Sequence, residues 1–296
     1  MATPVPPHAV PAGPLAVRWL AHELPLQRAG AKSVGRVQLE NAGSAAWRSR
    51  PGTGVHLSYH WLDPLGNPIV WAGAFILLPS TLAPGERAEV FVTLRAPIPP
   101  GRYRLAFDLV DEGRFWFADI GNTRLELDVD VAPRLAERTL TVEVRDGPPE
   151  LAAATREALG AQEEPLVNGG AEVIAFLAAG CRPAPDWSRL VLHAHAEGYG
   201  AVGGAIELTG SPLARRRAAR QLGPWTERLG RAPGWPHALV CPSLLRALAD
   251  EVPPTEDVGG LPALDPARLD EPWLFDGRIR VAVPATAPRR AGRRPA

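Results

Sequence analysis

The sequence has little cysteine and no long apolar run. Only two of its 296 residues are cysteines, Cys181 and Cys241, and their spacing matches no metal-binding pattern. Two isolated thiols in a chain of this length usually lie reduced in a core, which we expect here, with a disulfide between them as the alternative. No segment approaches the roughly 20 apolar residues that span a bilayer, and the N-terminus lacks a basic region followed by an apolar core. We therefore predict a cytoplasmic protein with no membrane span.

The chain also lacks net charge. Its 32 basic residues equal its 32 acidic residues, which argues against a nucleic-acid or anionic-membrane partner. Lys32 is the only lysine, and the abundance of arginine, alanine, proline and glycine is typical of a GC-rich bacterial genome. Residues 1–14 are rich in proline and residues 285–296 are rich in arginine. We expect both ends to be disordered, and the basic end to be a solvated extension rather than a nucleic-acid arm.

Residues 15–131 show the pattern of an all-β domain. Short segments of strand-forming residues recur at regular intervals, and turn sequences such as PLGNP and APGE separate them. In residues 125–131, apolar side chains alternate with acidic ones, as in a strand with one buried face. This pattern predicts an immunoglobulin-like β-sandwich. The predicted strands are residues 15–20, 34–40, 55–61, 75–78, 88–95, 103–110 and 125–131.

Residues spread over this domain also match a known module. They are Asn41, Gly43, Trp47, the run HWLD at 60–63, Trp71, the run PGE at 84–86, Tyr103, Asp108, Trp116 and Phe117. On these residues the domain resembles an immunoglobulin-like module found beside bacterial glycosyltransferases and methyltransferases, and it is similar in plan to the four-tryptophan modules of autophagy receptors. The resemblance implies a binding or docking module, with a glycan, a glycosyltransferase or another enzyme as its partner.

Four tryptophans are the ligand-binding candidates of this domain: Trp47, Trp61, Trp71 and Trp116. An exposed indole offers a flat apolar face on which a sugar ring can lie. Because large aromatic side chains mostly fill the interior of a sandwich, we expect these residues mainly in the core, with the sugar platform as the alternative. His56 and His60 lie about 13 Å apart along one strand, too far for one metal ion, so we expect them to be packing or surface residues.

After a linker at residues 132–139, residues 140–284 show a different pattern. Residues 140–144 predict a strand, and a helix follows at Pro148 and Pro149. Residues 173–177 are an unbroken apolar run, typical of a strand buried on both faces of a parallel sheet. Asp186 can then cap a helix with an apolar stripe at helical spacing. We predict a reduced α/β domain with a Rossmann-like sheet, so that the chain as a whole is multidomain.

Residues 172–204 resemble the centre of family 2 glycosyltransferases of the GT-A fold. In that family a buried strand ends in an acidic DxD motif, a proline turn and a helix follow, and a glycine pair lies at the next strand. The two carboxylates hold Mg or Mn on the diphosphate of a nucleotide sugar. Here Ala178 and Gly180 stand at those positions. A second nucleotide-binding strand and helix are also missing, so the resemblance implies a degenerate domain with no metal and no cofactor.

One acidic residue is the catalytic candidate of this domain. The run TED at 255–257 resembles the acidic pair whose aspartate acts as the base on the acceptor hydroxyl, which assigns that role to Asp257. Without a metal motif, we favour the alternative that this run is a solvated turn. Arg215 and Arg216 belong to an arginine-rich helix face that we expect to be solvated. They are the ligand-binding candidates for a diphosphate or an anionic glycan.

Three functions follow from these patterns. We favour a non-catalytic accessory protein of bacterial glycan or glycoconjugate assembly, which binds a glycan or a partner enzyme. The first alternative is an active, metal-independent glycosyltransferase that uses a nucleotide sugar, with Asp257 as base. The second is a sandwich that docks onto a protein partner, for which we expect an exposed apolar patch on one sheet.

Overall fold

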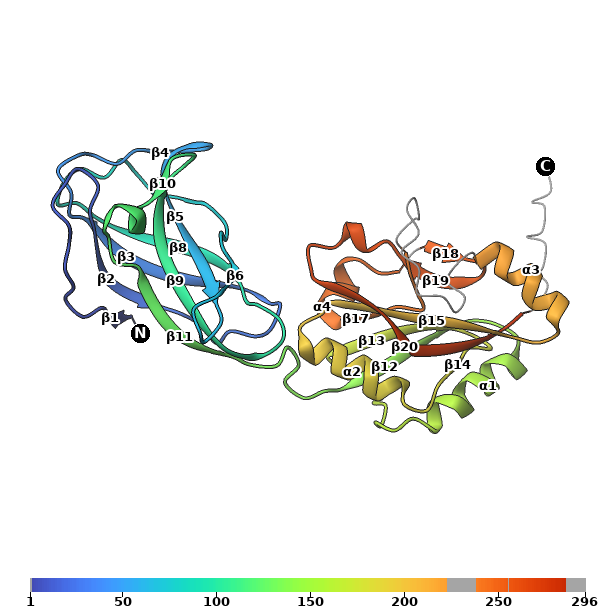
Figure 1. The fold of residues 1–296 in the computed structure, drawn as a ribbon. Helices are drawn as coiled ribbons and strands as arrows, with labels where there is room; N and C mark the ends of the chain where they lie inside the picture. Colours follow the sequence, from blue (N-terminus) through green and yellow to red (C-terminus); the bar gives the residue numbers. More distant parts are fainter. Residues whose placement is uncertain (1, 223–237, 255, 286–296) are drawn as a thin grey trace. The chain divides into compact units, whose positions relative to one another are not determined.

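The computed structural model describes residues 2–222, 238–254 and 256–285. The chain divides into two compact units, which meet in the sequence between Pro133 and Arg134 (Figure 1). Each unit has a hydrophobic core of its own. Among the helices in the described ranges, none has both the length and the apolar character that a membrane crossing requires.

The first unit is a β-sandwich of the immunoglobulin-like type, as predicted. Four strands form one sheet in the order β1-β2-β3-β8, and seven form the other, with β9 and β5 at its centre. β1 pairs with β2, so part of the segment that we expected to be disordered is a strand. The strands are β1 (Thr3–Pro4), β2 (Val17–Glu23), β3 (Lys32–Asn41), β4 (Ser49–Arg50), β5 (Thr53–Leu62), β6 (Pro68–Val70), β7 (Ile76–Leu77), β8 (Arg87–Arg95), β9 (Gly101–Asp111), β10 (Phe115–Trp116) and β11 (Leu125–Val131).

The core of the sandwich is built from alternate residues of its strands. On β5 the odd-numbered side chains Leu57, Tyr59 and Trp61 face inward, and they meet Leu105 and Phe107 of β9. None of these side chains is more than 5% exposed. Burial of each such side chain stabilises the fold by about 1.5–3 kcal/mol. The even-numbered side chains of β5 therefore lie on the outer face of the sheet.

The second unit contains a six-stranded sheet in the order β12-β13-β17-β15-β20-β14 and a three-stranded sheet in the order β16-β19-β18. The strands are β12 (Leu140–Arg145), β13 (Val173–Ala178), β14 (Arg182–Pro183), β15 (Ala201–Thr209), β16 (Leu239–Val240), β17 (Ser243–Leu245), β18 (Glu256–Val258), β19 (Leu261–Leu264) and β20 (Trp273–Pro284). The helices are α1 (Pro149–Gly160), α2 (Trp187–Glu197), α3 (Pro212–Leu222) and α4 (Arg246–Glu251).

The prediction of a Rossmann-like α/β domain of the GT-A type was wrong. Over the described residues of both units together, 43% lie in strands and 17% in helices. The six-stranded sheet is mixed, since β12–β13 and β15–β20 are parallel while β17 runs antiparallel to both of its neighbours and β14 runs antiparallel to β20. A Rossmann-like sheet needs successive parallel strands joined by crossover helices. The sequence misled because β17, only three residues long, enters between β13 and β15 without a recognisable pattern.

Both faces of this mixed sheet are covered. α1 and α2 lie on one side, and β18 and β19 lie on the other (Figure 1), with β16 paired to β19. Val173 of β13 belongs to one apolar cluster with Trp187 and Val191 of α2. Its neighbour Ile174 points to the opposite face and packs with Leu244. Burial on both faces explains why β13 reads as a continuous apolar run even though the sheet is not a parallel one.

The glycine pair of the sequence analysis lies on β15. A Cβ atom at Gly204 would lie 1.9 Å from the carbonyl oxygen of Ile279, and one at Gly203 would lie 2.9 Å from a methyl carbon of Leu239. The pairing of β15 with β20 shifts register immediately after Gly204. Both positions therefore need glycine because neighbouring chain segments approach too closely for a side chain.

Candidate functional site

The outer face of the seven-stranded sheet carries a row of buried polar side chains. His56, Ser58 and His60 alternate along β5, and Asp108 of β9 lies directly opposite Ser58. None of the four is more than 2% exposed. The outer face of a sandwich sheet usually meets water, so a second layer must cover this row.

That cover is aromatic. It consists of Trp71, Phe75 and Trp116, which we call the aromatic cluster. The Trp116 ring centre lies 6.2 Å from that of Trp71 and 6.0 Å from that of Phe75, with an edge-to-face geometry in both pairs. The imidazole of His60 lies beneath two of the rings, 4.7 Å from Trp71 and 4.5 Å from Trp116. Edge-to-face contacts of this kind stabilise by about 0.5–1.5 kcal/mol each, so they hold the rings in place.

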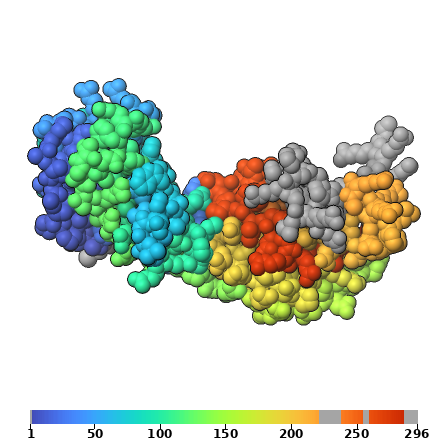
Figure 2. Space-filling model, in the orientation of Figure 1, coloured from blue at the N-terminus to red at the C-terminus, as the bar shows by residue number. Residues whose placement is uncertain are grey.

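Two rings of the cluster remain open to solvent although they cover the polar row. Trp71 is 49% exposed and Phe75 is 44% exposed. Both lie between β6 and β7. The light-blue residues that include this segment form part of the visible surface of the first unit in Figure 2. The cluster therefore presents rigid apolar faces at the surface.

A buried ion pair lies next to the cluster. The Arg124 Nε donates to Asp108 Oδ2 over 3.1 Å, and the backbone N–H of Leu109 donates to the other carboxylate oxygen over 2.8 Å. Burial raises the pKa of Asp108 to about 6, even though Arg124 opposes this shift. The Arg124 guanidinium also lies 5.4 Å from the centre of the Trp71 ring. Arg124 thus connects the buried carboxylate with an exposed ring.

The two histidines are fixed by backbone oxygens. The His60 Nδ1 donates to the carbonyl oxygen of Trp71, and the His56 Nε2 lies 3.0 Å from the carbonyl oxygen of Arg50. Burial lowers the pKa of His60, which keeps this imidazole neutral at pH 7. His60 Nε2 lies 4.0 Å from Asp108 Oδ2. Both histidines are packing residues, and His60 anchors the segment that carries Trp71.

The titratable groups of this site are closed off from the surface. Its acid and its imidazoles are buried beneath the rings, so they do not reach a molecule at the surface. Within residues 2–222, 238–254 and 256–285, no group of three His, Cys, Asp or Glu side chains is arranged to hold a metal ion. What the surface offers is flat apolar area beside a guanidinium, which suits a ligand that has an apolar face next to polar groups.

The structure separates the four candidate tryptophans into two pairs. Trp47 and Trp61 are fully buried inside the sandwich. Trp71 and Trp116 lie on the outer face of the sheet, in the aromatic cluster. Sequence reasoning missed Phe75 and Asp108 as members of the site. The available signal was the alternation of polar residues at 56, 58 and 60, which marks a polar outer face on β5.

In the second unit, the residues at the end of β13 are enclosed. The Gly180 N–H donates to the carbonyl oxygen of Leu151 over 3.1 Å and to Thr155 Oγ1 over 2.9 Å, both on α1. Gly180 has a φ of +96°, and a Cβ atom there would lie 3.0 Å from Pro284. Ala178 is buried as well. A carboxylate at position 180 would meet both backbone strain and a filled space.

The remaining candidates of the second unit lie on β18 and α3. Asp257 lies on β18 with its backbone opposite Pro262. Its side chain lies outside the described part of the structure, so its role as a base stays a prediction. Arg215 and Arg216 are exposed on α3.

A serine and a histidine do meet in the second unit. His195 Nε2 lies 3.0 Å from Ser243 Oγ, and His195 Nδ1 lies 2.8 Å from the carbonyl oxygen of Tyr199. Both side chains are fully buried, and burial lowers the pKa of His195 to about 4. The pair is closed to solvent, so it joins α2 to β17 and has no access to a substrate.

Comparisons with known proteins give only distant matches. No protein-family model and no curated protein matches the chain. Among solved structures, the C-terminal domain of Wzt matches with a TM-score of 0.29 and 10% identity, over 42% of this chain and 76% of that domain. A CARDB domain from Pyrococcus furiosus matches with a TM-score of 0.22 and 15% identity, over 39% and 83%. A PapD-like domain of human CEP192 matches with a TM-score of 0.23 and 18% identity, over 43% and 92%. At these values the matches carry no argument about function.

Proposed function

We propose that the first unit binds a carbohydrate on the aromatic cluster, and that the protein is a non-catalytic accessory component of glycan or glycoconjugate assembly. This proposal depends on one observation. Trp71 and Phe75 are about half exposed, and contacts with other rings and with His60 fix their positions. A ring held in place before binding loses little conformational entropy when a ligand arrives. A sugar can lay its C–H face on the indole and place a hydroxyl near the Arg124 guanidinium.

The second unit supports the non-catalytic part of the proposal. The end of β13, where the resemblance to family 2 glycosyltransferases would locate the metal carboxylates, is packed by α1 and Pro284. That resemblance and the cytoplasmic location both stay predictions. The alternative of an active transferase rests on Asp257 as base and on arginines such as Arg215 and Arg216 as partners of the diphosphate.

The test is a binding measurement on the full chain. Calorimetry or tryptophan fluorescence against a panel of mono- and oligosaccharides should give saturable binding, and Trp71→Ala should weaken it by about tenfold or more, because one stacking face is lost. Trp273→Ala is the matched control, since Trp273 is an exposed tryptophan of the second unit. Equal affinity in the wild type and Trp71→Ala, or no sugar binding across the panel, would count against the proposal.

A specific observation favours protein docking as the second candidate. Three more large apolar side chains near the cluster in sequence are exposed: Leu65, Ile69 and Leu77. Together with Trp71 and Phe75 they give the segment at 65–77 an apolar surface suited to a protein partner. A competition experiment shows whether the two ligands share the cluster. A bound oligosaccharide would displace a protein partner only if both bind at Trp71.

A further inference from the structure

The strand β8 ends the four-stranded sheet of the first unit. It is nine residues long and pairs with β3 along its length without a register shift. In the described part of the chain, β8 has no strand partner on its other side. Its central residue, Phe91, is 63% exposed on the outer face of the sheet. A long and regular edge with an exposed aromatic side chain is a template for another strand.

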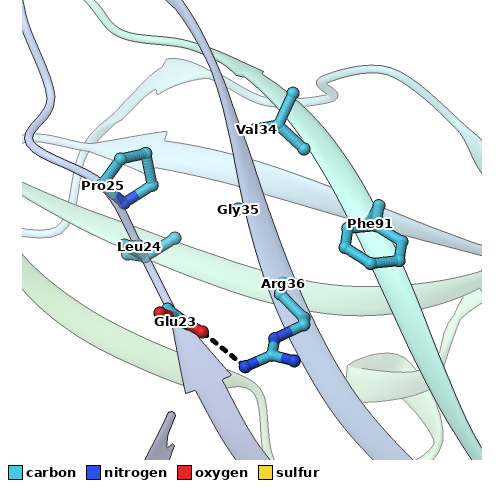
Figure 3. Close-up of a pocket in the computed structure, with 7 residues that line it drawn as sticks. All are labelled: Glu23, Leu24, Pro25, Val34, Gly35, Arg36 and Phe91. Carbon is cyan, nitrogen blue, oxygen red and sulfur yellow. Dashed lines mark hydrogen bonds and ion pairs between the residues drawn. The ribbon is translucent and has the colours of Figure 1, made fainter. Parts of the chain in front are cut away.

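The outer face around Phe91 is open as well. Phe91 and Val34 point to the same side of the sheet, and with Leu24 and Pro25 they line a groove of about 410 Å³ (Figure 3). The ion pair between Arg36 and Glu23 lies at one end of this groove. The exposed apolar area of this face thus adjoins the free edge.

Hydrogen bonds show which main-chain groups of β8 point to that edge. The Ala96 N–H donates to the carbonyl oxygen of Ala31, on the β3 side. The preceding Arg95 N–H donates to the Tyr59 hydroxyl over 3.2 Å instead. Because successive residues of a strand alternate in direction, the N–H and C=O groups of Glu89, Phe91 and Thr93 point away from β3.

We propose that a second copy of this chain pairs with β8 in antiparallel orientation, with Val92 opposite the partner's Val92. In this register Phe91 lies opposite the partner's Thr93, and the two exchange main-chain hydrogen bonds through groups that face the edge. The two Phe91 rings become diagonal neighbours, within reach of each other across the two-fold axis.

Charge complementarity selects this register. It places Glu89 opposite the partner's Arg95, whose guanidinium also donates to the carbonyl oxygen of Gly30 in its own chain, and the two-fold axis repeats the pair. If Phe91 lay opposite the partner's Phe91, Arg87 would face the partner's Arg95 and like charges would meet. The free edge of β8 therefore fits a second copy of itself, and the small area of such an interface predicts a weak dimer.

The proposal does not rest on sugar binding. β8 belongs to the four-stranded sheet, whereas the aromatic cluster covers the seven-stranded one. The oligomeric state is measured without any ligand, so the two proposals can fail separately.

Sedimentation velocity of the full chain over a concentration series tests the dimer. The mass should rise toward twice 31.7 kDa. Thr93→Pro should abolish this rise, because proline removes an N–H that faces the free edge and leaves the bonds to β3 in place. Circular dichroism checks that the variant is folded. A wild-type protein that stays monomeric up to about 1 mM would overturn the proposal.

A charge exchange tests the register independently. Glu89→Arg should weaken the dimer by about tenfold, and the double variant Glu89→Arg with Arg95→Glu should restore it, because the opposite charges meet again. Glu89 also bonds to Arg36 and Gln38 within its own chain. A purely local role for Glu89 would leave the double variant as weak as the single one, and that result would overturn the register.

Discussion

Each unit of the molecule buries a histidine, but in different surroundings. His60 of the first unit lies under rings that are themselves half open to water, beside a buried ion pair. His195 of the second unit is closed in by α2 and β17 and bonds only to neutral groups. A buried polar group below an exposed aromatic layer holds surface side chains in place. A buried polar group inside a core only connects the helices and strands around it. We therefore look for function in the first unit.

Replacing one tryptophan by alanine in each unit gives the strongest test of this difference between the two units. Trp187 is fully buried in the core of the second unit, so Trp187→Ala should lower the free energy of unfolding by about 4 kcal/mol. Trp71→Ala should cost only about 1–2 kcal/mol, because half of its ring already meets water. Denaturant unfolding measures both. Similar costs would mean that the aromatic cluster is an ordinary part of a core.

Acid should weaken the second unit through His195. Its folded-state pKa of about 4 lies below the ordinary 6.5, so the unfolded chain takes up the proton first. Stability is then fully present above pH 6.5 and falls by about 3 kcal/mol as the pH drops to 4. Amide hydrogen exchange by mass spectrometry follows this unit separately.

His195→Gln should remove most of that pH dependence. His193→Gln is the control, since His193 is exposed on the same helix. An unchanged slope in His195→Gln would show that other groups cause the acid sensitivity.

A smaller effect of opposite sign is expected in the first unit. The pKa of Asp108 is raised to about 6 from 3.8, so the folded state takes up this proton before the unfolded chain does. Asp108 should therefore add stability as the pH falls from 6 to 4. His60, whose pKa is lowered by burial, opposes this gain.

Asp108→Asn measures the Asp108 contribution. The variant should remove the gain on acidification, while Asp130→Asn, at an exposed carboxylate, should leave it unchanged. Hydrogen exchange in β5 and β9 reports the difference. An identical pH dependence of stability in the wild type and in Asp108→Asn would contradict the assignment.

The sequence predicted the sandwich well because each strand carries its own signal. Alternation marked residues 125–131 as a strand with one buried face, and turn residues marked where strands end. The sequence predicted only part of the aromatic cluster. Trp71 and Trp116 were candidates, but nothing in the sequence shows that the segment with Trp71 and Phe75 folds back over His60, because a loop that covers a sheet has no period of its own.

In the second unit, local sequence patterns predicted single strands and helices but not their order in the sheet. The strand at 173–177 and the helix that follows were predicted close to their positions in β13 and α2. Strand order was not predictable, because it depends on β17 pairing with segments about 40 and 70 residues earlier in the chain. The family resemblance suggested a Rossmann-like parallel sheet. The mixed sheet of the structure shows that this prediction was wrong.

The insertion of β17 has a consequence for synthesis on the ribosome. β13 and β15 leave the tunnel long before Ser243, and neither can bond to the other without the strand that lies between them. Until Ser243 emerges, a nascent chain therefore carries β13 and β15 without the strand that joins them, and apolar side chains such as Val202 lack part of their cover.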